Sequence, residues 1–174
     1  MTKTVIVGER PAAVDKMINE RHRLGQDVYD EVWEGDLHVV SVPPPWHGRL
    51  VAEVSRLIAG TARASRHEVV VMSGVRLGEE GNFRVPDTVV LDALAPCPPD
   101  YPPRALVVVE IVAPDDESFD KFGFYWDQGV EEILTIEQDR RVTWWERRSA
   151  YRPVLASDIL GTSTDYFSDQ IRWP

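Results

Sequence analysis

Apolar residues recur at helical spacing in two stretches of the chain. Within residues 46–65 the apolar positions fall three or four apart, as one face of a helix requires: Leu50, Val51, Val54, Leu57 and Ile58. Residues 11–24 form a second predicted helix, since Pro11 suits a first helical turn and Gly25 suits a stop. A shorter helix is expected from about residue 117 to 127, behind an acidic start and before a glycine.

The other apolar segments are short and rich in β-branched residues, which is typical of strands. The predicted strands are residues 28–33 and 37–42, which form a hairpin, then 68–72, 74–77, 83–92 and 105–112, and a final hairpin of 130–136 and 141–146. Residues 105–112 are apolar except for Glu110, so this strand is expected at the centre of the sheet. Residues 95–103 contain five prolines and are expected to form an extended loop.

No repeat, low-complexity tract or linker interrupts this order of elements. The mixture of helices and strands predicts an α/β fold, with a mixed β-sheet flanked by helices. We expect one domain over residues 1–174, with the helix 11–24 and the weakly patterned tail 151–174 peripheral to it.

Charge and composition narrow the class of protein. The 174 residues carry a formal charge of −10, from 19 Lys and Arg against 29 Asp and Glu, which counts against a broad phosphate-binding surface. The single cysteine, Cys97, excludes an internal disulfide and a multi-cysteine zinc site. No apolar run reaches the length of a membrane helix, and the N-terminal residues lack the apolar stretch of a signal peptide, so we expect a cytoplasmic protein with no membrane partner.

Three residues carry candidate chemistry. Glu110 lies inside the predicted central strand, where an ionised carboxylate is costly unless it is paired or binds a metal. Asp87 lies in another β-rich stretch, and two carboxylates at adjoining strand ends could share Mg²⁺, with Mn²⁺ as a substitute. Lys121 is one of only three lysines, and a lysine beside such a site could orient or deprotonate a water, or neutralise charge on a phosphate.

Several short motifs follow one another in a specific order. They are Arg84-Val85-Pro86-Asp87, the stretch from Val107 to Pro114, Asp120-Lys121 with Tyr125, and Gly129-Val130-Glu131-Glu132. Two further motifs precede them, Trp33-Glu34-Gly35-Asp36-Leu37 and Pro44-Pro45-Trp46-His47. Over roughly residues 28–148, this order resembles the Uma-type putative restriction endonuclease family of the PD-(D/E)xK nuclease superfamily.

The resemblance implies a restriction-endonuclease-like fold and a DNA substrate. It implies that Asp87 and Glu110 bind Mg²⁺, and that Lys121 is the catalytic lysine, moved from the strand (where Val112 stands) into the following helix. The departures from the family pattern are a connection from Glu110 to Tyr125 that is about one helical turn shorter, Ala113 in place of a serine, and Glu137 in place of an aspartate.

Each of these residues also has a purely structural interpretation. Asp87 could be an ordinary strand-end carboxylate, and Glu110 could pair with an arginine such as Arg84 or Arg76. Lys121 could lie on a helix surface, where its removal would cost little stability.

His47 stands at the start of the helix predicted over residues 46–65. It is a candidate accessory residue of the site, and equally a capping or packing histidine. The acidic run Asp115-Asp116-Glu117 fits the start of a helix better than a second metal site.

The leading hypothesis is a Mg²⁺-dependent endonuclease that hydrolyses phosphodiester bonds in DNA, with weak and salt-sensitive binding. The alternatives are a catalytically silent protein-interaction module on the same fold, and a hydrolase of a small phosphorylated molecule. A positive groove leading to Asp87 would favour DNA, and an acidic rim would favour an alternative; the candidate arginines are Arg84, Arg140, Arg141, Arg147 and Arg148. The sequence leaves the oligomeric state open, a homo-oligomer included.

Overall fold

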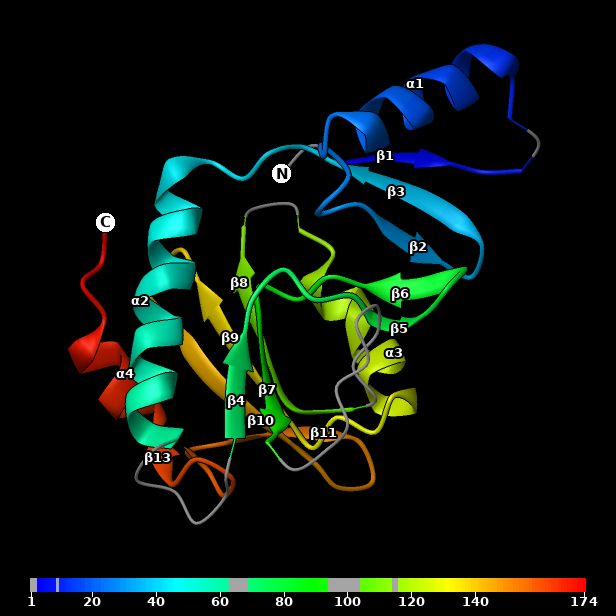
Figure 1. Ribbon diagram of the computed structural model, residues 1–174. Helices are drawn as coiled ribbons and strands as arrows, with labels where there is room; N and C mark the ends of the chain where they lie inside the picture. The colour runs from blue at the N-terminus through cyan, green and yellow to red at the C-terminus, as the bar shows by residue number, and fades with distance from the viewer. Residues whose placement is uncertain (1–2, 9, 63–68, 94–103, 114–115) are drawn as a thin grey trace.

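The computed structural model describes residues 3–8, 10–62, 69–93, 104–113 and 116–174. Within these ranges the chain forms a large and a small β-sheet, a two-stranded ribbon and four α-helices (Figure 1). The predicted α/β class, with a mixed sheet flanked by helices, is confirmed. The loop predicted at 95–103, with Cys97 inside it, lies outside the described residues.

The large sheet has six strands. In spatial order they are β11 (Tyr151–Val154), β10 (Val142–Arg147), β9 (Glu132–Glu137), β8 (Ala105–Val112), β7 (Thr88–Asp92) and β4 (Val69–Met72). Among the described strands, only β8 and β9 pair in parallel. A 3₁₀ turn, η1 (Ser118–Lys121), and the helix α3 (Phe122–Asp127) connect these two strands. The sheet is therefore mixed, and β8 lies inside it as predicted from its apolar sequence.

The small sheet has five antiparallel strands. In spatial order they are β1 (Lys3–Ile6), β3 (Asp36–Val40), β2 (Glu31–Trp33), β6 (Asn82–Arg84) and β5 (Leu77–Glu79). The predicted hairpin is confirmed as β2 and β3, which pair from Trp33 and Asp36 at the turn. A second hairpin joins β5 and β6, whose last pair before the turn is Glu79 and Asn82.

The helices are α1 (Ala12–Arg23), α2 (Pro45–Ala62), α3 (Phe122–Asp127) and α4 (Thr164–Gln170), with a 3₁₀ turn η1 (Ser118–Lys121) directly before α3. The helices predicted at 11–24 and 46–65 are confirmed as α1 and α2 over their described residues. The helix predicted over 117–127 is present but tightens into η1 for its first turn. None of the described helices is long and apolar enough to cross a bilayer.

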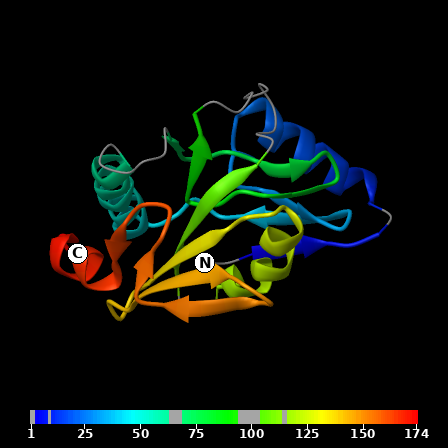
Figure 2. The ribbon, with the colours of Figure 1, turned by 90° about the horizontal axis from the view of Figure 1, so that it is seen from below.

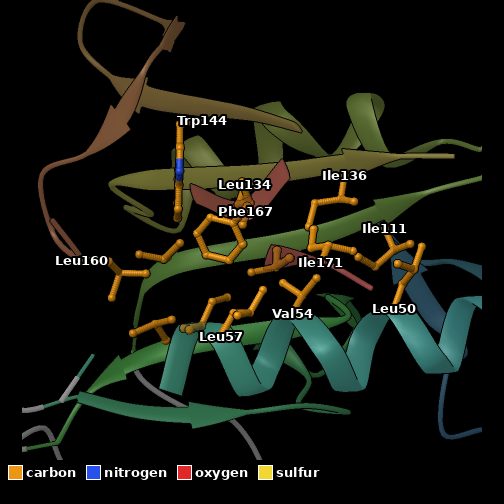
Figure 3. Packing of buried hydrophobic residues seen from close by; sticks show 14 of the residues in the cluster. Leu50, Val54, Leu57, Ile111, Leu134, Ile136, Trp144, Leu160, Phe167 and Ile171 are labelled. Carbon is orange, nitrogen blue, oxygen red and sulfur yellow. The ribbon is translucent and has the colours of Figure 1, made fainter. Parts of the chain in front are cut away.

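Helices cover both faces of the large sheet (Figure 2). On one face, Leu50, Val54 and Leu57 of α2 pack against β8 and β9, and α4 extends this core (Figure 3). On the other face, Phe124 and Tyr125 of α3 pack against the sheet. Since side chains alternate along a strand, Glu110 is directed to the α3 face, two residues after Val108.

The stretch 83–92 was predicted as one strand, and this prediction is wrong. β6 ends at Arg84 in the small sheet, and β7 begins at Thr88 in the large one. Pro86 has no backbone N–H to donate, and the N–H of Val85 donates to the side chain of Glu31 (2.9 Å) instead of to a strand. The break moves the chain between the sheets and leaves Asp87 at their junction.

The C-terminal residues are not peripheral, contrary to the expectation for 151–174. β11 adds a strand to the large sheet, and the ribbon of β12 (Ala156–Ser157) and β13 (Thr162–Ser163) leads into α4. Leu160, Phe167 and Ile171 are buried in the core beneath α2. These three residues are spaced too irregularly to form a periodic pattern, because a turn and a short helix separate them.

Candidate active site

Two acidic side chains meet where β7 and β8 adjoin. Thr88 pairs with Val109 across the antiparallel strands, so the preceding Asp87 lies beside Glu110. The backbone N–H of Ile111 donates to Asp87 Oδ2 at 2.7 Å. Glu110 is only 3% exposed, in the wall of a cavity that Asp87 also lines. The structure therefore brings together the two carboxylates singled out in the sequence.

Lys121 lies inside the protein, between two glutamates. Its Nζ is 3.2 Å from Glu110 Oε1 and 2.9 Å from Glu31 Oε1, and the residue is only 6% exposed. The alternative of a surface lysine is therefore wrong. The short connection after β8 is compatible with this position because η1 carries Lys121 directly over the α3 face of the sheet, where Glu110 points.

Glu110 forms a buried ion pair, as its structural interpretation expected, but its partner is not an arginine. Its cation is Lys121, whereas the two arginines considered from the sequence pair elsewhere. Arg84 contacts Glu34 at 3.2 Å, and Arg76 contacts Asp27 at 3.7 Å.

Glu31 is a site residue that the sequence did not reveal. It is 2% exposed and its carboxylate is held from two sides: Oε1 accepts the Val85 N–H and Oε2 accepts the Trp33 indole N–H, both at 2.9 Å. Its sequence position gave little indication of a site, since an acidic residue at the start of a hairpin strand is normally exposed to solvent. The contact between the small sheet and η1 places it beside Lys121.

Tyr125 completes the buried cluster. Its hydroxyl donates to Glu110 Oε1, the oxygen that also contacts Lys121. Burial raises the pKa of Tyr125 well above its usual value, so the phenol stays a neutral donor. In the described part of the chain, no group donates to the other oxygen, Oε2, which leaves it available to the cavity.

His47 contacts the carboxylate of Asp87 from the other side. Its Nε2 lies 3.3 Å from Asp87 Oδ1, without the alignment of a hydrogen bond, and no other described group bonds to this buried nitrogen. Burial lowers the pKa of His47, but the neighbouring Asp87 more than offsets it, so the pKa is raised above its usual value. Its position beside Asp87 fits an accessory role better than a packing role.

A cavity of about 230 Å³ lies at the junction of the two sheets. The carboxylate, imidazole and ammonium side chains in its lining are those of Glu31, His47, Asp87, Glu110, Asp116, Glu117 and Lys121. Carboxylates thus outnumber the one lysine and one histidine, and the cavity favours a cation. Asp116 and Glu117, expected to form only a helix start, therefore also belong to its rim.

Burial and charge set the protonation of the central pair. Burial raises the pKa of Glu110 to about 8; Lys121 opposes this rise, while the Asp87 and Glu31 carboxylates add to it. Burial lowers the pKa of Lys121, but Glu110 and Glu31 more than compensate and raise it well above its ordinary value. Lys121 therefore stays protonated, and Glu110 is the group in this pair that can exchange a proton.

The chemistry of these donors fits a hard divalent cation. Mg²⁺ commonly binds one or two protein carboxylates and keeps several waters, and Asp87 and Glu110 supply such a pair beside the cavity. Among the described residues, no three His, Cys, Asp or Glu side chains are grouped closely enough to hold a metal by themselves. A cation here would therefore depend on this carboxylate pair and on water.

The five arginines considered for a positive groove do not converge on Asp87. Arg84 is buried, with its guanidinium 4.3 Å above the rings of Trp33 and Phe124. The other four lie at opposite ends of β10: Arg140 and Arg141 before it, Arg147 and Arg148 at and beyond its end. None of the five lines the cavity. The rim is acidic, which disfavours a long duplex held by many phosphate contacts.

The fold of this chain is also found in a solved structure. It is similar to the crystal structure of a "putative nuclease belonging to DUF820" from Anabaena variabilis, with a TM-score of 0.66, 14% identity, and coverage of 81% of this chain and 90% of that chain. At this identity the likeness concerns the fold alone. No curated protein matches the chain.

The family follows from a second comparison. The family model described as "Uma2: Putative restriction endonuclease" matches residues 18–164, and the chain belongs to this family. The resemblance inferred from residues 28–148 is confirmed. Membership supports a nuclease with a nucleic-acid substrate.

Proposed function

We propose that this chain is a Mg²⁺-dependent nuclease of the PD-(D/E)xK type that hydrolyses phosphodiester bonds in DNA, with the cytoplasm as its expected compartment. The observation that carries the proposal is the convergence of Asp87, Glu110 and Lys121 at one cavity between the sheets. Membership in the Uma2 family supports the same conclusion.

In this proposal Asp87 and Glu110 hold the metal ion. When bound, Mg²⁺ polarises a phosphate and lowers the pKa of a water in its shell. Asp87 is preoriented by the Ile111 N–H on one oxygen and by His47 beside the other. Glu110 contributes its free oxygen, and the Tyr125 hydroxyl fixes its orientation.

Lys121 acts as a cation in this proposal. A lysine whose pKa is raised cannot accept a proton from water at neutral pH, so it does not serve as the general base. It instead neutralises charge that develops on the phosphate oxygens. Glu31 positions Nζ, because its own carboxylate is fixed by the Val85 and Trp33 donors.

The acidic rim favours a second candidate function. A hydrolase of a small phosphorylated molecule needs the same metal and lysine but no basic surface. The cavity, with Lys121 as its one lysine and no arginine in its lining, suits that candidate. A small substrate must therefore be tested beside DNA.

The expected result is Mg²⁺-dependent cleavage of labelled DNA that stops in EDTA. Asp87→Asn should lower kcat/KM by at least about 100-fold, since even residues that only support metal ligands cost up to that much. Glu79→Gln, at an exposed strand residue of the small sheet, is the matched control and should cleave as wild type does.

An aryl phosphodiester is assayed under the same conditions. Hydrolysis of this compound without cleavage of DNA would support the second candidate. Hydrolysis of neither substrate would contradict both candidates and favour an interaction module.

A further inference from the structure

A second cavity, of about 470 Å³, adjoins the first. The two share Tyr29, Pro43, His47 and Asp87, so the side chain of Asp87 stands in the wall between them. The outer walls come from the first three turns of α2, from the proline segment before it, and from the bend after β4. Figure 1 shows α2 and β4, the helix and the strand next to which these lining residues lie.

The chemistry of the second cavity differs from that of the first. Apart from the shared His47 and Asp87, no charged residue lines it. Prolines on both sides give rigid walls, and Gly48 and Ala52 on α2 leave room between them. Such a cavity has the size of a small-molecule site, and the charged groups in its lining are the two it shares with the first cavity. An uncharged group joined to an occupant of the first cavity fits this lining.

A set of hydroxyls gives this cavity a polar floor. Ser55 and Ser73 both line it, and both hydrogen-bond to the buried Thr88, at 2.8 Å and 3.1 Å. These three hydroxyls carry three protons but share only two hydrogen bonds. When Thr88 donates to one serine, that serine keeps its proton for a ligand, and both serines keep lone pairs. The two serine hydroxyls can therefore both donate hydrogen bonds to a ligand and accept hydrogen bonds from it.

Tyr29 supplies an aromatic surface at the mouth. It is 43% exposed and borders both cavities. Aromatic rings stack on nucleobases of any sequence. An uncharged planar group with donors and acceptors along its edge, attached to a phosphodiester, is a nucleoside.

We propose that the second cavity binds the nucleoside next to the scissile phosphate, and that the substrate strand is unpaired at that nucleotide. The proposal rests on the nuclease function proposed above. A base in a duplex is stacked and paired, and it enters a walled protein cavity only after it leaves the stack. The acidic rim and the scattered arginines agree, since neither suits a long duplex.

The test is binding, which does not depend on cleavage. Anisotropy of a short labelled DNA strand is measured with Ca²⁺ in place of Mg²⁺, first for the single strand and then for the same strand in a duplex. Ala52→Trp fills the cavity from an exposed helix position; Ala13→Trp, at an exposed position of α1, is the matched control. We expect the wild type to bind the single strand at least about tenfold more tightly than the duplex, and Ala52→Trp to remove that preference.

Equal binding of strand and duplex by the wild type, or wild-type binding by Ala52→Trp, would overturn the proposal. Failure of the nuclease function gives a different result. Selective binding that Ala52→Trp blocks, without cleavage in Mg²⁺, would retain the nucleoside site and reject the nuclease. Cleavage in Mg²⁺ that Ala52→Trp leaves unchanged would retain the nuclease and reject the nucleoside site.

Discussion

Lys121→Ala is expected to lower the free energy of unfolding by about 3–5 kcal/mol, the usual cost of removing one partner from a buried ion pair. The substitution leaves Glu31 and Glu110 facing each other without a cation, in a place where both are almost fully buried. A lysine on a helix surface would cost far less. The size of the stability loss therefore tests whether Lys121 is buried between Glu31 and Glu110.

Urea unfolding gives this free energy directly. Lys16→Ala, at an exposed lysine of α1, is the matched control and should change stability by less than about 0.5 kcal/mol. Adding Glu31→Gln to Lys121→Ala removes one stranded charge and should recover part of the loss. A Lys121→Ala protein as stable as Lys16→Ala would contradict the buried cluster.

The stability of the metal-free protein is expected to fall as pH rises from about 4.5 to 8, and Glu110→Gln should abolish most of that fall. The ordinary pKa of Glu110 is 4.5 and burial raises it to about 8 in the fold. Between these values the folded chain binds a proton that the unfolded chain has released, so the contribution of Glu110 to stability is fully present below this range and is lost across it. The full effect of this change in pKa on the free energy of unfolding is about 5 kcal/mol.

The measurement is the urea midpoint in EDTA across this pH range. The difference between wild type and Glu110→Gln isolates Glu110, because all other titrating groups are common to both. Glu79→Gln should keep the wild-type slope, since its carboxylate lies on an exposed part of β5. Parallel curves for wild type and Glu110→Gln would show that Glu110 is not protonated in the fold.

The sequence was sufficient for elements with a strong local pattern. α2 and β8 are long and periodic or continuously apolar, so their burial could be predicted without knowing their neighbours. The split at Pro86 could not be predicted, because it depends on Glu31 of the neighbouring strand β2 accepting the Val85 N–H just beyond β6. The core role of Phe167 depends likewise on α4 returning to α2.

Some residues of the candidate site could likewise be predicted from the sequence, and others could not. Asp87 and Glu110 could be found because each is a carboxylate next to or inside an apolar strand. Glu31 could not be found in this way, since its burial beside Lys121 arises where its own small sheet meets η1, far along the chain. The second cavity arises from small side chains and prolines, which carry no sequence signal of a ligand.

Calorimetric titration of Mn²⁺ tests most directly whether Asp87 and Glu110 form a metal centre. The wild type is expected to bind the ion. Free Mn²⁺ at about 100 times its dissociation constant should raise the free energy of unfolding by about 2.7 kcal/mol. Asp87→Asn and Glu110→Gln should each weaken binding by at least about tenfold, while Glu79→Gln binds as wild type does. The metal centre would be contradicted if the wild type did not bind Mn²⁺, or if Asp87→Asn and Glu110→Gln bound it as tightly as the wild type does.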